Sequence, residues 1–257
     1  MTRCLISLSI FAVFGCSGSQ PGPGAEESTL RTEAAFCEAW AEAVCSDRAV
    51  MACSSELDSC LENQAQACRA LVPPGYSAKH AEECLEAVGD AYDDATLTTD
   101  ELEVVLKLGG DCKRIIDGGQ EEGSECVEST DCDGVNGFEC VVQPGQTLGT
   151  CEIPVEVGAG RRCSTPGAVC SADFYCDGTN CVERLPEGEP CDGDVCEVGF
   201  RCALATGETE TTCIPQLALR QPCTSDDECA SGLCLGTTRR CVDTVPLTFE
   251  SSFCDDF

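Results

Sequence analysis

The sequence predicts a small disulfide-rich protein in which a disulfide-stapled α-helical domain precedes four tandem cysteine-rich units built as short β-ribbons. Three observations predict this fold class: 26 cysteines among 257 residues, a four-cysteine pattern that recurs over residues 123–241, and helical periodicity in the segment before it. Cysteine at this density persists as disulfides only in an oxidising compartment. The chain is therefore expected to be exported.

The recurring pattern defines four units, whose first cysteines lie 37, 28 and 32 residues apart, as is typical of tandem small modules. Each unit is too small for a core of its own, so disulfides have to hold it. A bridge that closes a loop of about 15 residues contributes about 3 kcal/mol. Four cysteines allow three connectivities, and the spacing leaves all three open. The four sets are Cys126, Cys132, Cys140, Cys151; Cys163, Cys170, Cys176, Cys181; Cys191, Cys196, Cys202, Cys213; and Cys223, Cys229, Cys234, Cys241.

The domain boundaries follow from changes in composition along the chain. The N-terminal part divides into a signal peptide, a tether and a helical domain, and the C-terminal part into the four units and a tail. The expected segments are residues 1–15 (signal peptide), 16–31 (tether), 32–117 (helical domain), 118–151, 152–181, 182–213 and 214–241 (units one to four), and 242–257 (tail).

The N-terminus has the features of an export signal. Arg3 supplies the positive charge, and residues 4–14 form an apolar run that is too short to span a bilayer as a mature helix. The run ends in Val13-Phe14-Gly15-Cys16, which resembles the lipobox of bacterial lipoproteins. The resemblance implies that Cys16 is acylated and anchors the chain to the lipid bilayer.

The residues after Cys16 agree with a lipid anchor. Residues 17–25 are polar and rich in glycine and proline, so a flexible tether is expected there. By resemblance to bacterial sorting, Ser17 favours the outer membrane, and the expected location is the outer membrane or the cell surface. The alternative is ordinary cleavage near Gly15 or Gly18, followed by free secretion.

Four short helices are expected between residues 33 and 108. Phe36, Trp40 and Val44 recur at helical spacing in the first helix. The serines at 54–55 are expected to cap the second helix. A third follows, and Thr98-Thr-Asp-Glu101 forms a capping box at the start of the fourth.

The cysteines of the helical domain suggest a stapled hairpin. Two of them lie eight residues apart on the expected first helix, and two more lie eight residues apart on the second. An antiparallel hairpin would bring these pairs face to face in nested order, and the leftover cysteines would close the array back onto its base. The predicted pairs are Cys45–Cys68, Cys53–Cys60, Cys37–Cys84 and Cys112–Cys254.

Composition and spacing argue against three classes of function. The chain has no Cys-x-x-Cys pair and a single histidine, which disfavours zinc binding and a thioredoxin-like redox site. Its formal net charge is −31 and no basic stripe is present, so it is not expected to bind nucleic acid.

Calcium is the one metal for which the sequence offers candidates. Asp131 and Asp133 flank a cysteine before a glycine, and Asp192 and Asp194 flank a glycine, which is a fragment of the spacing used by calcium loops. Neither pair belongs to the full twelve-residue pattern with its terminal glutamate. Acidic turns are therefore the favoured interpretation, with calcium as the alternative.

Catalytic groups are sparse. His80 is the only histidine, it falls on a predicted helix beside acidic residues, and it is expected to face solvent rather than to act as a base. A pair of catalytic carboxylates would need a large buried scaffold to shift one pKa, and the composition argues against such a scaffold. The expectation is a protein without enzymatic activity and without a cofactor.

Two of the units resemble a known extracellular family. Cys223-Thr-Ser-Asp-Asp-Glu-Cys229-Ala-Ser-Gly-Leu-Cys234, and more loosely Cys191-Asp-Gly-Asp-Val-Cys196-Glu-Val-Gly-Phe-Arg-Cys202, are similar to the Dickkopf N-terminal cysteine-rich region. EGF-like modules are a more distant likeness. The resemblance covers only the units and implies an extracellular interaction module, without the signalling activity of that family.

The expected function is that of an exported, cysteine-rich surface lipoprotein, which serves as a binding or structural module for an unidentified protein or glycan ligand. The main alternative is a secreted inhibitor, for example of proteases. In that case a disulfide-framed loop such as residues 143–150 or 206–212 would occupy an active site, because a pre-organised loop loses little entropy on binding.

Overall fold

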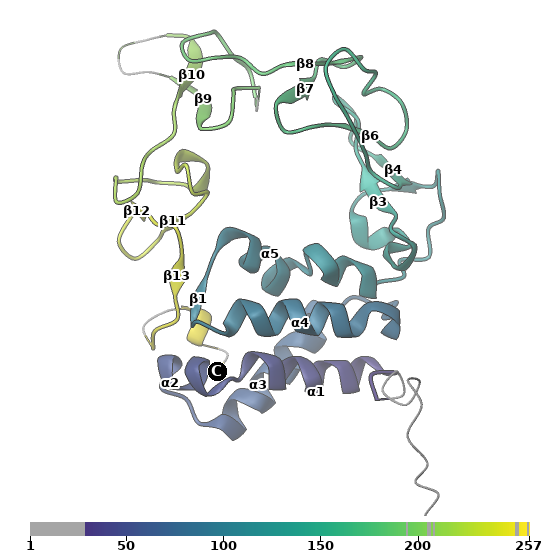
Figure 1. Cartoon of the computed structure of the whole chain (residues 1–257), viewed down its shortest axis with the longest axis vertical. Coiled ribbons are helices and arrows are strands. Elements are labelled where there is room, and N and C mark those ends of the chain that lie inside the picture. Colours follow the sequence, from purple (N-terminus) through teal and green to yellow (C-terminus); the bar gives the residue numbers. More distant parts are fainter. Residues whose placement is uncertain (1–28, 194, 205–206, 208, 250–251, 256) are drawn as a thin grey trace, which may run out of the picture.

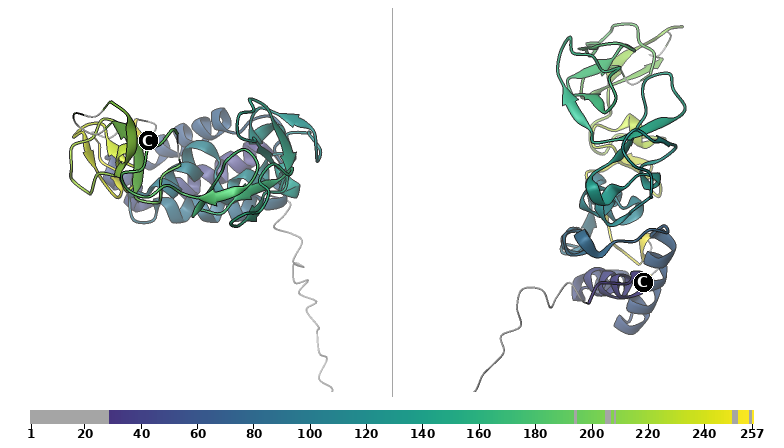
Figure 2. Two further views of the ribbon diagram at one scale, coloured as in Figure 1. Left: turned by 90° about the horizontal axis from the view of Figure 1, so that it is seen from above. Right: turned by 90° about the vertical axis from the view of Figure 1, so that its right-hand side faces the viewer.

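The computed structural model describes residues 29–193, 195–204, 207, 209–249, 252–255 and 257. The helices are stacked in tiers, and residues 118–241 form an arch above them (Figure 1). We call these two parts the helical layer and the arch. Both ends of the arch meet the helical layer, and the side view in Figure 2 shows that the two parts together form a narrow slab. The predicted fold class is confirmed.

The first predicted helix is in fact two helices. α1 (Glu33–Val44) ends before Cys45, and α2 (Asp47–Cys53) begins after Ser46, whose side chain accepts a hydrogen bond from the Ala49 N–H at 3.2 Å. Ser46 therefore acts as an N-cap that interrupts the helix. The serines at 54–55 do not cap α3 (Leu57–Leu71), because Ser54 ends α2 in a left-handed conformation with φ 54°.

The remaining helices follow the sequence prediction more closely. η1 (Ala78–His80) leads into α4 (Ala81–Tyr92), and α5 (Thr99–Lys107) is followed by the 3-10 helix η2 (Gly110–Ile115). The predicted capping box is present: the Thr98 hydroxyl accepts from the Glu101 N–H at 3.3 Å, and the Glu101 carboxylate accepts from the Thr98 N–H at 2.7 Å. In Figure 1, α5 lies nearest the arch and α1 and α3 lie farthest from it.

All four disulfide pairs predicted for the helical domain and tail are wrong. Cys37, Cys45 and Cys53 are evenly spaced at eight residues, so two registers against α3 satisfy the same spacing. Because α2 occupies the turn between α1 and α3, the hairpin forms in the other register. In place of Cys45–Cys68, Cys53–Cys60, Cys37–Cys84 and Cys112–Cys254, the structure contains Cys37–Cys68, Cys45–Cys60, Cys53–Cys254 and Cys84–Cys112.

The C-terminal tail closes the arch onto the helical layer, as expected, although through a different cysteine. β13 (Val245–Pro246) pairs antiparallel with β1 (Thr96–Leu97), and Cys254 is bonded to Cys53. We call the β1–β13 pair and the Cys53–Cys254 disulfide the C-terminal clamp. Leu247 and Phe257 are buried in the core of the helical layer, so the last residues of the chain complete the core that the first helices begin.

Each unit of the arch is a short β-hairpin in which the third and fourth cysteines are direct cross-strand partners. Unit one has an extra strand, β2, and unit two begins with a parallel pair, β5 and β6. The strands are β2 (Glu125–Cys126), β3 (Glu139–Val141) and β4 (Gly149–Glu152) in unit one; β5 (Val155–Val157), β6 (Ala168–Cys170), β7 (Phe174–Cys176) and β8 (Cys181–Glu183) in unit two; β9 (Phe200–Leu204) and β10 (Thr211–Pro215) in unit three; and β11 (Cys234–Leu235) and β12 (Arg240–Cys241) in unit four.

The structure selects one of the three possible connectivities, and it is the same in all four units. The first cysteine is bonded to the third and the second to the fourth. These disulfides provide most of the interior, since the buried cluster of unit one consists of Cys126, Cys132 and Cys151, and that of unit four has the equivalent three cysteines. The eight pairs are Cys126–Cys140, Cys132–Cys151, Cys163–Cys176, Cys170–Cys181, Cys191–Cys202, Cys196–Cys213, Cys223–Cys234 and Cys229–Cys241.

A left-handed residue lies three positions before the first cysteine of every unit. Its N–H donates to the carbonyl oxygen of the fourth cysteine at 2.7 to 2.8 Å, which joins the start of the unit to its end. Glycine adopts this conformation without steric penalty, whereas unit four uses an arginine there. The four residues are Gly123 (φ 78°), Gly160 (φ 68°), Gly188 (φ 84°) and Arg220 (φ 68°).

Non-reducing peptide mapping should recover Cys45–Cys60 and Cys53–Cys254, because α2 separates α1 from α3 and the tail returns to α2. A Cys53–Cys60 linkage would contradict the register described here. Within the arch, every unit should give the first-to-third and second-to-fourth pairs.

Gly160→Ala should lower the free energy of unfolding by about 1 to 2 kcal/mol, the penalty of a left-handed conformation for a residue with a Cβ. No atom lies within 4 Å of the position that a Cβ at Gly160 would occupy, so the loss is conformational rather than steric. Gly158→Ala is the matched control, because Gly158 has equally open surroundings and no positive φ. Urea unfolding with the disulfides intact measures both variants, and equal effects would refute the argument.

Candidate binding surface

The arch is held in shape by polar side chains at the junctions between units. Lys113 of η2 forms an ion pair with Glu139 of unit one at 3.2 Å. Gly134 of unit one lies so close to η2 that a Cβ would meet the Lys113 carbonyl oxygen at 2.5 Å. Between units three and four, the Arg201 guanidinium lies 3.6 Å from the Glu228 carboxylate. Specific contacts therefore fix unit one to η2 and unit three to unit four.

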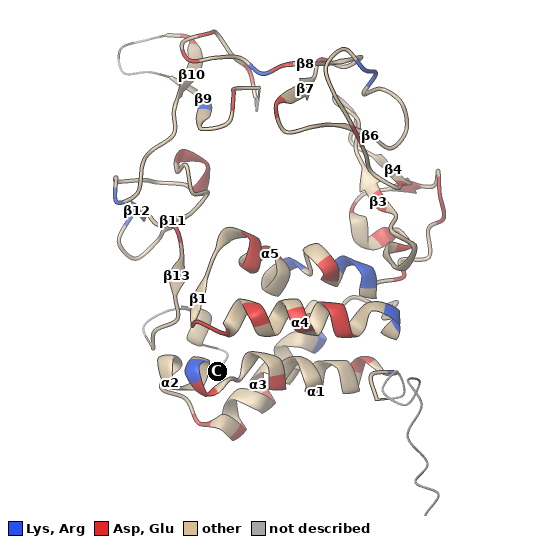
Figure 3. Cartoon of the chain, viewed as in Figure 1, with Lys and Arg blue, Asp and Glu red and all other residues tan. Residues whose placement is uncertain are grey.

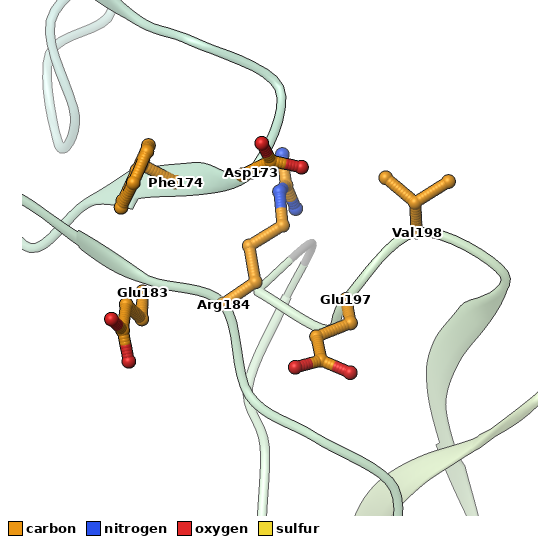
Figure 4. Close-up of a pocket in the computed structure, with 6 residues that line it drawn as sticks. All are labelled: Asp173, Phe174, Glu183, Arg184, Glu197 and Val198. Atoms are coloured by element: carbon orange, nitrogen blue, oxygen red, sulfur yellow. The ribbon is translucent and has the colours of Figure 1, made fainter. Parts of the chain in front are cut away.

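The junction between units two and three contains an open hollow of about 440 Å³. Arg184 crosses it and donates to the Ala172 carbonyl oxygen at 2.7 Å and to the Cys196 carbonyl oxygen at 3.2 Å. Figure 4 shows its guanidinium beside Asp173, whereas Glu197 points away from it. Because Arg184 already binds backbone atoms of both units, it positions the junction rather than presenting a free charge.

His80 is buried, contrary to the expectation that it faces solvent. Its Nδ1 lies 2.7 Å from the Glu83 carboxylate and its Nε2 lies 3.0 Å from Arg114 Nη2. A guanidinium can only donate, so Nε2 accepts and the ring proton is on Nδ1, where it is donated to Glu83. Both ring nitrogens are engaged, and this arrangement ties η1 and α4 to η2 rather than leaving a base available for catalysis.

The calcium candidates in the described part of the chain do not converge on a site. The Asp131 carboxylate accepts from the N–H groups of Val127 and Glu128, and the Asp133 carboxylate accepts from Asn136. Asp192 is exposed, and Asp194 lies outside the described residues. Across the ranges that the structure describes, the only groups of three metal-binding side chains are cysteines, and all of these are in disulfides.

The acidic residues of the arch serve instead as turn caps. Backbone N–H donors hold the pKa of three carboxyl groups below its ordinary value: Val127 and then Glu128 act on Asp131, and Asn180 and then Thr179 act on Asp177. The Thr224 N–H is the largest cause for Glu228. Asp131 and Glu228 occupy the same place, directly before the second cysteine of units one and four, and an acidic residue there is the sequence signal for this cap.

Among the residues with described side chains, the only buried polar or charged ones are Gln64 and His80. No buried carboxylate is present in that set, so the described structure contains no pair of fixed carboxyl groups of the kind that glycosidases use. The carboxylates of Asp131 and Glu228 cap turns of the arch, and its exposed surface is what remains for recognition.

The two loops considered as inhibitory segments are hairpin connections. Residues 143–148 lie in the connection between β3 and β4, and residues 149–150 already belong to β4, next to Cys151. Residues 206–212 approach β10, but residues 206 and 208 lie outside the described residues. Large apolar side chains are exposed near both loops, Leu148 in the first and Leu204 before the second.

Comparison with protein-family models, with curated proteins and with solved structures finds no match for this chain. The likeness of units three and four to the Dickkopf region therefore stays a prediction. Cys16 lies outside the described residues, and no helix among those described has the length and apolarity needed to cross a bilayer. What the structure does support is a disulfide-rich fold of the kind found in exported proteins.

Acid should destabilise the arch through its capping carboxylates. Because the pKa of Asp131 is lowered on folding, its cap contributes fully above the ordinary carboxyl value of 3.8 and is lost as the pH falls through the lower folded value. Asp131→Asn should therefore reduce the urea midpoint of unfolding at pH 7. Between pH 4 and pH 2 the midpoint of the variant should decrease less than that of the unchanged chain. Asp192→Asn, at an exposed aspartate of unit three, should change neither the urea midpoint at pH 7 nor its decrease in acid. An equal loss in that control would contradict the role of Asp131 as a turn cap.

Proposed function

We propose that this chain is an exported lipoprotein without enzymatic activity, and that its arch is a rigid binding module displayed at the cell surface. The observation that carries the proposal is the C-terminal clamp. Because both ends of the arch are attached to the helical layer, the loops are pre-organised, and little conformational entropy is lost when a partner binds.

The arrangement of the helical layer supports an anchor at Cys16. The described chain starts at residue 29, and the Leu30 carbonyl oxygen accepts from the Tyr76 hydroxyl at 2.7 Å, next to α1. α1 lies in the tier farthest from the arch (Figure 1). A tether of thirteen residues spans at most about 40 Å, so an anchor at Cys16 would hold the helical layer near the membrane with the arch facing outward.

The charge of the molecule bears on the class of partner. Acidic side chains are found on the helical layer and on the arch (Figure 3), which agrees with the net charge of −31. Such a surface resists non-specific association and gives no default site for nucleic acid. An extracellular protein or a glycan is the partner class that we propose, in line with the resemblance of the units to an extracellular interaction module.

A secreted inhibitor of proteases is the second candidate. The observation in its favour is the β3–β4 hairpin, because Cys140 and Cys151 at its base are both in disulfides and residues 144–148 are exposed. A panel of proteases tests this candidate. Inhibition that disappears when the loop is cut between residues 144 and 148 would favour it over a surface module.

The experiment for the leading proposal compares the full chain with two variants in a bacterium that processes lipoproteins. Cys16→Ser should move the protein from the membrane fraction to the soluble fraction, and intact mass should show an acylated N-terminus on the unchanged chain. Cys53→Ser with Cys254→Ser keeps every loop and charge but removes the disulfide of the C-terminal clamp and leaves only the β1–β13 pair to hold it. Partners crosslinked to the arch on intact cells should then be recovered severalfold less. An unmodified Cys16 would refute the lipid anchor. Capture that does not depend on the clamp would refute the rigid binding module.

A further inference from the structure

The parallel strand pair of unit two borders a hollow that the fold does not use. It has a volume of about 590 Å³, and its lining includes Val155 and Val157 of β5, Pro166 and Ala168, and the arginines Arg161 and Arg162. A hollow of this size can accommodate a side chain together with a charged group. An apolar wall beside two cations is unusual in a chain with a net charge of −31.

The two arginines are available to a ligand. Elsewhere in the arch, Arg184, Arg201 and Arg240 bind carbonyl oxygens or a carboxylate of the chain itself. Within the described structure, the side chains of Arg161 and Arg162 make no hydrogen bond and no ion pair, and both residues are exposed. Two guanidinium groups that line one hollow suit a carboxylate, which a guanidinium binds through paired hydrogen bonds.

β5, whose valines line the hollow, also has a free strand edge. It pairs only with β6, in a two-stranded sheet. Val155 donates to the Gly167 carbonyl oxygen and the Val157 carbonyl oxygen accepts from Ser171, so in this parallel register the N–H and C=O of Glu156 face away from β6. No described residue pairs with them. A free edge of this kind can accept an additional strand.

Apolar side chains accompany that edge. Ile153 and Val155 are 55% and 57% exposed at alternate positions, and they therefore lie on the same face of the extended segment. An incoming strand would cover them, which would remove apolar surface from water. The free edge and the exposed Val155 thus belong to the same strand, and the two arginines line the hollow that this strand borders.

We propose that this place is a binding site for an extended peptide that carries a carboxylate. The peptide adds as a strand beside β5, covers Ile153 and Val155, and places an acidic side chain or its C-terminal carboxylate on Arg161 and Arg162. The net charge of the chain repels anions at long range, so recognition depends on the two guanidinium groups at contact distance. The inference rests on the proposed function, because it names the partner class of the binding module.

The test uses the purified, disulfide-intact chain and a fluorescein-labelled probe, Val-Thr-Val-Thr-Glu-Glu with a free C-terminus, followed by fluorescence anisotropy. Arg161→Gln with Arg162→Gln should weaken binding at least tenfold, since it removes the groups that pair with the carboxylate. The control, Arg239→Gln, removes an exposed arginine of unit four and should change the affinity less than twofold. Intact mass confirms that all variants keep their disulfides.

Variants of the probe separate the remaining possibilities. Replacing both glutamates by glutamine, or amidating the C-terminus, identifies which carboxylate binds. Replacing the central valine by proline removes a backbone donor and should weaken binding if the peptide adds as a strand. Binding that is unchanged in the double arginine variant, no binding at millimolar probe, or a preference for phosphatidylglycerol vesicles over the peptide would overturn the proposal. If the purified chain binds the probe but no partner is captured on intact cells, the proposed surface location is rejected and the proposed peptide site stands.

Discussion

The structure depends on the return of the C-terminal tail to the helical layer. The clamp adds to the other contacts between the arch and the helical layer. Gly134 and Glu139 of unit one contact η2, and the Ser231 carbonyl oxygen of unit four accepts from the Thr99 hydroxyl of α5 at 2.9 Å. The tail also supplies Leu247 and Phe257 to the core of the helical layer, so the fold of the first helices and the position of the last unit are linked. A chain with small, separately stapled units obtains in this way a single defined shape.

Within the arch, covalent and backbone interactions replace a hydrophobic core. The disulfides of each unit bury one another, a left-handed residue ties the start of the unit to its fourth cysteine, and in units one and four a carboxylate caps the turn before the second cysteine. None of these stabilising interactions requires a particular residue in the loops. The loop residues are therefore free to vary, and a scaffold of this kind is suited to presenting recognition surfaces.

The same reasoning explains where a ligand site can occur. Two arginines of the arch, Arg184 and Arg201, hold units together at two junctions. Arg161 and Arg162 instead line a hollow beside a strand that has a free edge. The sequence shows that no basic stripe is present but does not distinguish structural arginines from free ones, because that difference depends on which carbonyl oxygens and carboxylates the fold brings within reach.

The sequence by itself determined the fold class, the number of units, the capping box before α5 and the return of the tail, because cysteine spacing, parity and local capping are properties of neighbouring residues. Only the tertiary structure decided the pairing of cysteines. Cys37, Cys45 and Cys53 are equally spaced and allow two registers, and the choice was made by Ser46, which caps α2 and lengthens the turn to α3. Cys254 then bonds to Cys53 because the hairpin leaves that cysteine without a partner, while Cys112 is taken by Cys84. His80 was likewise misjudged, since its burial depends on Arg114 of η2, a contact that spacing along one helix cannot reveal.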